Sequence, residues 1–411
     1  MKKSTRSIVT LILIVSLCFA VAGCNRQNND PTTVTPTTTA IDPTTVAPTT
    51  APDPTTVTPT TAPDPTTPDP NKPEERTVTV TDMSGDEVTI KGEVTRIINL
   101  WPAGTSSFFA MGAGDLLAGM ANTGSINEWV KFLYPDSVNI PTVGGTTPTV
   151  EDLIKLNPDL VIIHPSTAAS GFAQQIRAVG IPAININFSN YETMRQAYTI
   201  LGEVLGGEYQ QKLTDWCDET DNKITNVRNL TANLTAEQRP VVYYIAGQSN
   251  SMTSTMAADS IFSDWVESAG GRYGTRLMSI ATGDITAESI FALNPDVFIV
   301  GGVWQHVIKN SIETTAGWQD LKAVKNERLY TNPYACFNWD RFGLESQLQI
   351  NYALLCIQPE IAAANGINRE SMIGEIIAFY QKYTNVELTQ QQAEYMLDGL
   401  SPDGKAENSV Q

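Results

Sequence analysis

The chain of 411 residues contains only two histidines and five cysteines, and its 26 basic residues are outnumbered by 44 acidic ones. Two histidines exclude the histidine-rich centres that capture a bare zinc or manganese ion. Five cysteines in so long a chain exclude a small scaffold held together by disulfides. The formal net charge of −18 argues against nucleic-acid binding, which needs basic surface to displace the counterions of the phosphates. The composition therefore indicates an acidic protein of two or three domains with ample core.

The N-terminus has the parts of a secretory signal. Three basic residues within the first six positions precede an apolar stretch, 8–20, that is short for a membrane span. This stretch ends in Val-Ala-Gly-Cys at 21–24, which resembles a bacterial lipobox. We therefore expect residues 1–23 to be a signal peptide and Cys24 to carry a lipid on the outer face of the cytoplasmic membrane. The alternative is an ordinary cleavage site followed by an incidental cysteine.

The segment after the signal has low complexity. Thr and Pro fill 28 of the 40 positions between 31 and 70. Such a tract cannot bury a core, and it favours an extended chain with polyproline II character. We expect residues 24–73 to be a lipid-bearing linker, with the folded part beginning near residue 74.

From residue 74 onward, short apolar strands alternate with helical stretches. A hairpin is predicted from segments 76–80 and 87–90, which flank the turn residues Ser84 and Gly85. Further strands are predicted at 96–100, 160–163, 183–186, 241–245, 297–300 and 328–330. This alternation is typical of an α/β fold with parallel sheets covered by helices on both faces.

One segment of fifteen residues occurs twice. Residues 149–163 and 286–300 are identical at seven of fifteen positions without a gap. Each copy is predicted to form a helix capped by its threonine, an Asn-Pro stop and a buried strand. The third residue, Glu151 or Glu288, lies in the first helical turn, where the helix dipole stabilises a negative charge. The repeat predicts two similar α/β lobes.

A helical stretch between the two copies is long enough to connect the lobes. Its apolar residues Leu213, Trp216 and Ile224 give it one buried stripe. We therefore expect an N-terminal lobe at 74–190, a helical connector at 191–236, a C-terminal lobe at 237–362, and C-terminal helices with a tail at 363–411.

These features together resemble the solute-binding lipoproteins of ABC importers for iron–siderophore complexes, haem and cobalamin, the class III periplasmic binding proteins. The likeness rests on the lipobox and linker, on segments 77–85 and 94–100, and on the duplicated Leu-Asn-Pro-Asp. It covers about residues 76–360 and implies two Rossmann-like lobes with parallel sheets, joined by a long rigid helix. The ligand would lie in the cleft between the lobes, which move little on binding.

The resemblance also implies partners and a role. It implies a monomeric receptor without enzymatic activity or intrinsic cofactor, which delivers a metal chelate to a permease dimer and its ATPase subunits. In this family one surface glutamate on each lobe docks into arginine pockets of the permease, and Glu151 and Glu288 match that pattern. The alternative for both glutamates is simple compensation of the helix dipole. A surface scavenger or sensor of the same fold, not coupled to transport, would not need both.

Candidate ligand contacts follow the carboxyl ends of strands, where open α/β sheets bind their ligands. Both histidines lie there and could serve as axial ligands of a chelated iron or cobalt, or could only bond to backbone. Three tryptophans could pack against a flat macrocycle or against the opposite lobe. One arginine could pair with a ligand carboxylate or with the nearby Asp340 or Glu345. The candidates are Trp101, Thr123, His164, Trp304, His306, Trp339 and Arg341.

The scarcity of arginine among these candidates bears on the ligand. Siderophore binders often carry several cleft arginines, whereas this sequence offers one clear candidate, Arg341. That difference favours a corrinoid or haem over a strongly anionic ferric chelate. The sequence leaves the choice open among the three.

Overall fold

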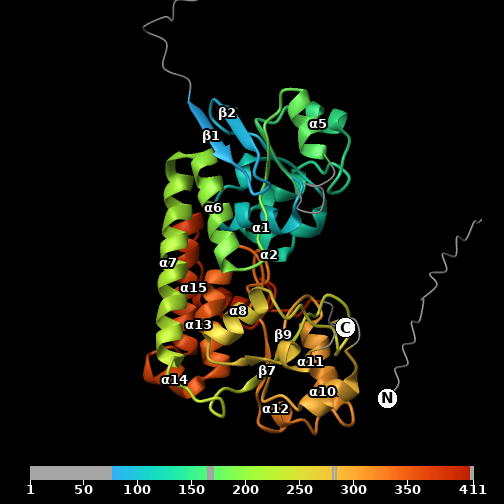
Figure 1. The fold of residues 1–411 in the computed structure, drawn as a ribbon, viewed down its shortest axis with the longest axis vertical. Coiled ribbons are helices and arrows are strands. Elements are labelled where there is room, and N and C mark those ends of the chain that lie inside the picture. The colour runs from blue at the N-terminus through green and yellow to red at the C-terminus, as the bar shows by residue number, and fades with distance from the viewer. Residues whose placement is uncertain (1–75, 164–170, 280–281, 283–284, 408–411) are drawn as a thin grey trace, which may run out of the picture. The chain divides into compact units, whose positions relative to one another are not determined.

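The N-terminal lobe is the upper part of the body in Figure 1. Its sheet has four parallel strands in the order β4-β3-β5-β6. The structure, a computed structural model, describes residues 76–163, 171–279, 282 and 285–407, all within one compact unit, 71–411. The strands are β3 (Ile97–Asn99), β4 (Leu117–Met120), β5 (Leu160–Ile163) and β6 (Ala183–Asn185). The helical elements are α1 (Pro102–Ala110), η1 (Gly114–Leu116), η2 (Thr123–Ser125), α2 (Glu128–Leu133), η3 (Pro135–Asn139), α3 (Val150–Lys155) and α5 (Phe172–Ala178).

The predicted hairpin precedes this sheet and is fixed to it by one buried carboxylate. Strands β1 (Thr77–Thr81) and β2 (Glu87–Lys91) pair antiparallel. Asp82 accepts hydrogen bonds from the backbone N–H of Ser84 (2.9 Å) and of Asn185 at the end of β6 (3.0 Å). Asp82 also accepts the backbone N–H of Asp86 (3.1 Å) and forms an ion pair with Arg177 of α5 (3.0 Å). The aspartate thus closes the turn and also anchors the hairpin to the lobe.

The C-terminal lobe repeats the arrangement with the strand order β10-β9-β7-β8, again all parallel. The strands are β7 (Val241–Ile245), β8 (Arg272–Tyr273), β9 (Val297–Val300) and β10 (Leu329–Thr331). The helices of this lobe are α8 (Ile261–Ser268), α9 (Gly274–Met278), α10 (Ala287–Leu293), α11 (Gln305–Thr314) and α12 (Lys322–Lys325). Because β5, β7 and β9 are buried along their whole length, they form sheet centres that are covered on both faces.

The two copies of the repeat have the same local structure, α3–β5 in one lobe and α10–β9 in the other. Their threonine side chains cap the helices by accepting the N–H of the residue three positions on, as predicted. Asn157 and Asn294 end the helices with positive φ, 46° and 45°, a conformation that asparagine tolerates. The following aspartates, Asp159 and Asp296, accept backbone N–H groups where the neighbouring strand begins. In each copy the asparagine therefore ends the helix, and the aspartate binds the backbone where the neighbouring strand begins.

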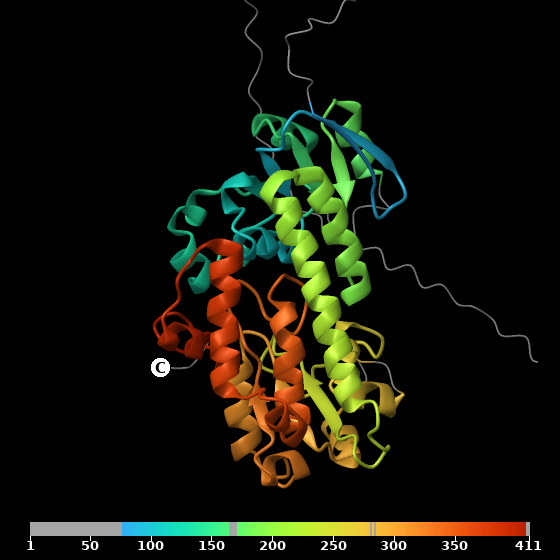
Figure 2. The ribbon, with the colours of Figure 1, turned by 90° about the vertical axis from the view of Figure 1, so that its left-hand side faces the viewer.

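Two helices connect the lobes. Helix α6 (Tyr191–Leu205) packs on the N-terminal lobe and turns at Gly206 (φ +69°) into α7 (Gly207–Thr231). Figure 2 shows α7 running beside both lobes, next to the C-terminal helices. These are α13 (Ser346–Ile357), α14 (Pro359–Ala364), α15 (Arg369–Thr384) and α16 (Gln390–Leu397). The predicted fold class, two parallel α/β lobes with a long connecting helix, is confirmed.

Candidate functional site

Loops at the carboxyl ends of the strands bring the two lobes into direct contact. Asn127, which caps α2 of the N-terminal lobe, donates its side-chain amide to the carbonyls of Ala335 (2.9 Å) and Cys336 (3.0 Å). The N–H of Ile261 at the start of α8 donates to Ser189 of the N-terminal lobe (3.0 Å). These contacts fix the loop after β10 and the start of α8 against the N-terminal lobe.

An aromatic cluster lies at the same boundary. Trp101 follows β3, Phe188 follows β6, and Phe342 comes from the C-terminal lobe. The ring centroid of Trp101 is 4.2 Å from that of Phe188 and 6.0 Å from that of Phe342. Phe188 and Phe342 are 5.6 Å apart. Trp101, a predicted site residue, therefore packs between the lobes with 8% of its surface exposed. Sequence reasoning missed the other two rings.

Arg341 belongs to a buried polar network in the C-terminal lobe. Its Nε donates to Oδ1 of Asp340 (2.6 Å) and its Nη2 donates to the Tyr244 hydroxyl (2.8 Å). That hydroxyl donates in turn to Oδ2 of Asp340 (2.6 Å). Burial acts to lower the pKa of Arg341, but the adjacent Asp340 charge and Tyr244 raise it above its usual value. Of the two readings that the sequence left open, the structure shows the internal ion pair with Asp340.

The space around this network requires a glycine. A Cβ added to Gly301, directly after β9, would lie 1.9 Å from Oδ2 of Asp340 and 2.4 Å from the Tyr244 oxygen. No side chain fits there without displacing the buried carboxylate. Trp339, one residue before Asp340 and another predicted site residue, is fully buried. The side chains of Trp339, Asp340 and Arg341 are therefore all buried in this structure.

Glu345 is a buried carboxylate that supports the same loop. It accepts the backbone N–H groups of Cys336 (3.0 Å) and Phe337 (2.8 Å) and the hydroxyl of Tyr380. Burial raises the pKa of Glu345 to about 7, although these hydrogen bonds act to lower it. No sequence motif marks this residue, because its partners lie on two different segments, the loop at 336–337 and helix α15.

Glu345 gives the protein a pH dependence that can be measured. Its folded pKa lies above the ordinary value of 4.5, so the folded state keeps the proton over a range where the unfolded state loses it. We therefore expect the free energy of unfolding to fall as pH rises from about 4.5 to about 7, by about 3 kcal/mol from this group. Glu345→Gln, which imitates the protonated acid, should flatten this slope in urea unfolding series at several pH values. The exposed Glu360→Gln is the control, and parallel slopes for Glu345→Gln and wild type would contradict the assignment.

Of the two histidines, His306 lies within the described residues and contacts backbone. Nε2 of His306, in the first turn of α11, donates to the backbone carbonyl of Gly399 (3.0 Å). Burial lowers the pKa of His306, which favours the neutral imidazole. His164 lies outside the described residues.

Trp304 precedes α11 and packs against the core of the C-terminal lobe, and Thr123 begins η2. Trp101 thus contacts Phe342, the residue that follows Arg341 in the chain. His306 is held by a contact with backbone.

The partner of His306 belongs to a segment within 363–411, which the sequence predicted only as C-terminal helices with a tail. Residues 398–407, the C-terminal strap, follow α16 and contact both lobes. Trp129 of α2 donates its Nε1 to the carbonyl of Leu400 (2.7 Å), one residue after the Gly399 carbonyl that binds His306. The strap therefore bridges α2 of the N-terminal lobe and α11 of the C-terminal lobe.

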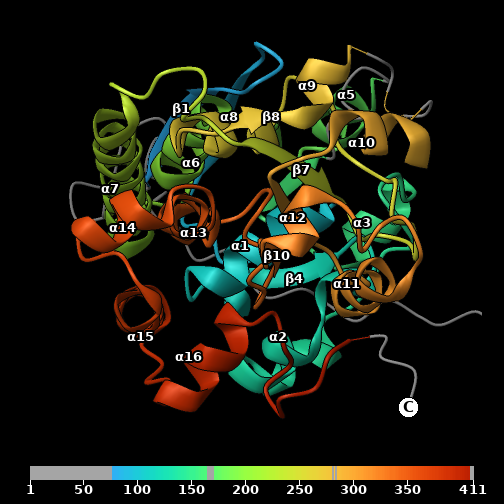
Figure 3. The same cartoon turned by 90° about the horizontal axis from the view of Figure 1, so that it is seen from below.

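The glutamates of the repeat, Glu151 and Glu288, are exposed on α3 and α10. Neither forms an ion pair with a described residue. The pKa of Glu288 is lowered by the backbone N–H and by Thr286 beside it, so it stays ionised. Figure 3 shows α3 and α10 on the side of the body opposite α7. These two charges are thus available to a partner.

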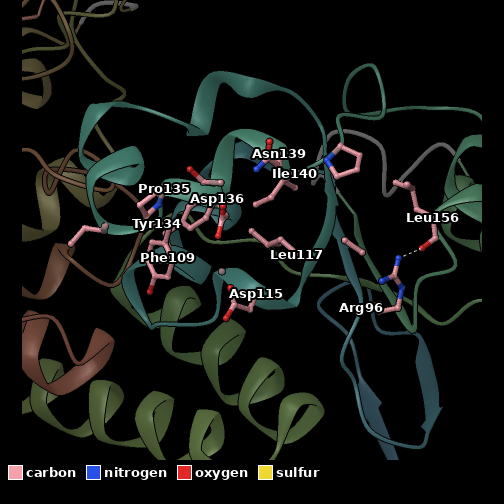
Figure 4. Close-up of a pocket in the computed structure, with 15 residues that line it drawn as sticks. Arg96, Phe109, Asp115, Leu117, Tyr134, Pro135, Asp136, Asn139, Ile140 and Leu156 are labelled. Carbon is pink, nitrogen blue, oxygen red and sulfur yellow. Dashed lines mark hydrogen bonds between the residues drawn. The ribbon is translucent and has the colours of Figure 1, made fainter.

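A separate pocket of ≈ 460 Å³ lies in the N-terminal lobe (Figure 4). Its walls are mostly apolar, with Leu117, Tyr134 and Ile140, and it carries the carboxylates of Asp115 and Asp136. It lies where β3 and β4 begin, the sheet edge opposite to that of Trp101. None of the predicted site residues that the structure describes lines it.

Three general findings apply to the described residues. No group of three or more His, Cys, Asp or Glu side chains in this part of the chain is placed to hold a metal ion. None of its helices is both long enough and apolar enough to cross a membrane. The three cysteines in this part, Cys217, Cys336 and Cys356, are free and buried.

Two parallel α/β lobes that meet at their strand ends and are joined by a long helix define a bilobal binding protein. The sequence model of the family described as "Periplasmic binding protein" matches residues 97–335. The chain therefore belongs to this family, and it is a class III member serving ABC transporters. It is a substrate-binding protein of an ABC importer, a transporter component without enzymatic activity.

Two relatives and one solved structure are similar to this chain at 21–25% identity. The chain is 25% identical to the "Uncharacterized ABC transporter substrate-binding lipoprotein YvrC" of Bacillus subtilis, over 63% of this chain and 79% of that protein. It is 24% identical to a cobalamin-binding protein of Halobacterium salinarum, over 54% of this chain and 58% of that protein. A periplasmic solute binding protein from Veillonella parvula has the same fold, with a TM-score of 0.67 and 21% identity over 78% of this chain and 97% of that one.

Proposed function

We propose that this receptor captures a metal chelate at the boundary between its lobes, and that the chelate is a corrinoid rather than a strongly anionic ferric complex. The observation that carries this proposal is the aromatic cluster of Trp101, Phe188 and Phe342, to which both lobes contribute. Flat rings of this kind bury the face of a macrocycle well. Arg341, the one clear cationic candidate, is already neutralised by Asp340, so little positive charge is left for an anionic ligand.

Two further points support the proposal. The relative from Halobacterium salinarum is named a cobalamin-binding protein. His164 and His306 are proposed as axial ligands of the chelated metal, and neutral imidazole suits cobalt and iron alike. Thr123 and Trp304 complete the proposed contacts, and Trp339, whose side chain is fully buried, would contribute through the loop that it supports. Haem is the second candidate, because the same rings and histidines would suit it.

The receptor is proposed to act on the outer face of the cytoplasmic membrane. Cys24, which lies outside the described residues, would carry the lipid anchor, as the lipoprotein relative from Bacillus subtilis supports. Glu151 and Glu288 would dock the loaded receptor onto the permease dimer, whose ATPase subunits drive uptake. The alternative role, a scavenger or sensor without transport, makes no use of two equivalent exposed glutamates.

A binding experiment with three probes tests the ligand. The purified protein is titrated with cobalamin, haem and a ferric siderophore, and binding is monitored by ultraviolet–visible spectra and by thermal unfolding. We expect cobalamin to raise the unfolding temperature, and Trp101→Ala to weaken its binding about tenfold or more, since a buried aromatic anchor is lost. The matched control is Phe132→Ala, an exposed aromatic side chain on α2.

The other outcomes either identify a different ligand or exclude metal chelates as the ligand class. A Soret band that disappears in the His164→Ala, His306→Ala double variant would replace the corrinoid by haem. Binding of the ferric siderophore alone would contradict the argument from Arg341. No response to any of the three probes would remove the metal-chelate class.

A further inference from the structure

Large hydrophobic side chains that remain exposed are few on the described surface, and two of them occupy the same place in the repeat. Ile154 on α3 is 48% exposed and Phe291 on α10 is 37% exposed. Each is the sixth residue of its copy, although the amino acid itself differs. A duplicated exposed hydrophobic position is unexpected, because each lobe would be more soluble with a polar residue there.

Packing within the lobes does not explain these positions. The residue just before each of them, Leu153 or Ile290, is fully buried and already joins its helix to the core. Phe291 contacts the lobe only in part, with its ring at 5.3 Å from that of Trp318 in an edge-on arrangement. Exposure at equivalent positions of the two lobes points to a shared external contact.

The neighbour of each exposed hydrophobic residue is a glutamate. Ile154 lies three residues after Glu151, and Phe291 lies three residues after Glu288. Residues three apart on a helix are neighbours on one face. Each lobe therefore presents a charge–apolar pair, Glu151 with Ile154 and Glu288 with Phe291, and no ion pair with a described residue neutralises either glutamate.

We propose that Ile154 and Phe291, the apolar members of the two pairs, become buried against the two subunits of the permease dimer when the receptor docks. This inference rests on the proposed docking function of Glu151 and Glu288. Two equivalent pairs on one chain fit a partner with two equivalent surfaces, each offering a cationic side chain beside an apolar recess. The receptor has a net charge of −18 and offers carboxylates at these points. Because interfaces are complementary in charge, the partner surface is expected to be basic there.

The two members of each pair have different tasks. The glutamate steers the encounter and makes binding sensitive to salt, since exposed charges are screened. The hydrophobic side chain is buried in the complex, where it excludes water around the ion pair and slows dissociation. Ile154 and Phe291 are thus expected to set how long the receptor stays on the permease.

The test measures binding of the mature full-length chain to the permease–ATPase complex in nanodiscs at several salt concentrations. Ile154→Ser and Phe291→Ser are each expected to raise the dissociation constant about fivefold to tenfold, through faster dissociation and with unchanged salt dependence. Glu151→Ala and Glu288→Ala are expected to weaken binding and also to reduce its salt dependence. Thermal unfolding and ligand binding should match wild type in all four variants.

The chain offers close controls for both hydrophobic changes. Val179→Ser removes a β-branched side chain that is 49% exposed, as Ile154 is 48% exposed. Phe132→Ser removes a ring that is 44% exposed and meets Trp129 edge-on at 5.9 Å, much as Phe291 meets Trp318. Neither control lies on α3 or α10, so neither should change binding to the permease.

The outcomes separate this inference from the proposed function beneath it. If only the glutamate variants weaken binding, docking through Glu151 and Glu288 stands and the apolar contact is refuted. If neither set weakens it, the docking assignment itself fails. If Val179→Ser and Phe132→Ser weaken binding equally, the effect is one of general surface hydrophobicity and the inference is overturned.

Discussion

Replacing Glu151 and Glu288 together by alanine should abolish uptake of the ligand while leaving its affinity for the receptor unchanged. Both side chains are exposed and form no ion pair with a described residue, and the caps from Thr149 and Thr286 stay in place. Removal of one partner from a charge pair that is buried in a complex is expected to weaken docking at least about thirtyfold for each glutamate. Uptake of labelled ligand by cells that carry the variant measures the result.

The control for this prediction removes the same charge elsewhere. Glu360 and Glu370 are also exposed and also lie in the first turns of helices, α14 and α15. The double variant Glu360→Ala, Glu370→Ala should transport normally. Loss of ligand affinity in the Glu151, Glu288 variant would place these residues in the binding site instead. Undiminished uptake would favour a receptor that does not dock through them.

Arg341→Ala is expected to destabilise the folded protein by about 3–5 kcal/mol. The change leaves the Asp340 carboxylate, which is fully buried, without its cation and with the Tyr244 hydroxyl as a remaining donor. An uncompensated buried charge costs roughly this amount, whereas an apolar replacement of the whole pair is often neutral. Equilibrium unfolding in urea measures the difference.

A double variant without either charge distinguishes the ion pair from simple loss of packing. The variant Asp340→Asn, Arg341→Met removes both charges and keeps most of the volume, so it should be more stable than Arg341→Ala. If the two variants are equally unstable, the network contributes by shape alone. If Arg341→Ala costs less than about 1 kcal/mol, the pair is not an essential part of the folded state.

The sequence predicted most strands because they are apolar runs rich in β-branched residues. Segments 160–163, 241–245 and 297–300 become β5, β7 and β9 with the expected boundaries. Strands β4 and β8 were missed. Leu-Ala-Gly-Met and Arg-Tyr carry no such local signal, and these segments become strands only because a neighbouring strand pairs with them.

The residues of the candidate site were also predicted only in part. Trp101 was found because it follows a predicted strand, but its partners Phe188 and Phe342 were not, since an aromatic residue in a loop has no periodicity to mark it. For Arg341 the sequence allowed either a ligand carboxylate or an internal partner. Tyr244, which completes its network, is 97 residues away, so no local pattern could have indicated the contact.

The sequence by itself determined the two lobes, their duplicated helix–strand unit, the caps of that unit and the exposure of its glutamates. These features follow from hydrophobic periodicity and from side chains that bond to backbone within a few residues. The tertiary structure alone decided which side chains meet where the lobes touch, including the aromatic cluster, the Asp340–Arg341 pair and the strap at 398–407. Such contacts join residues far apart in the chain, and their energies depend on burial, which only the packed fold creates.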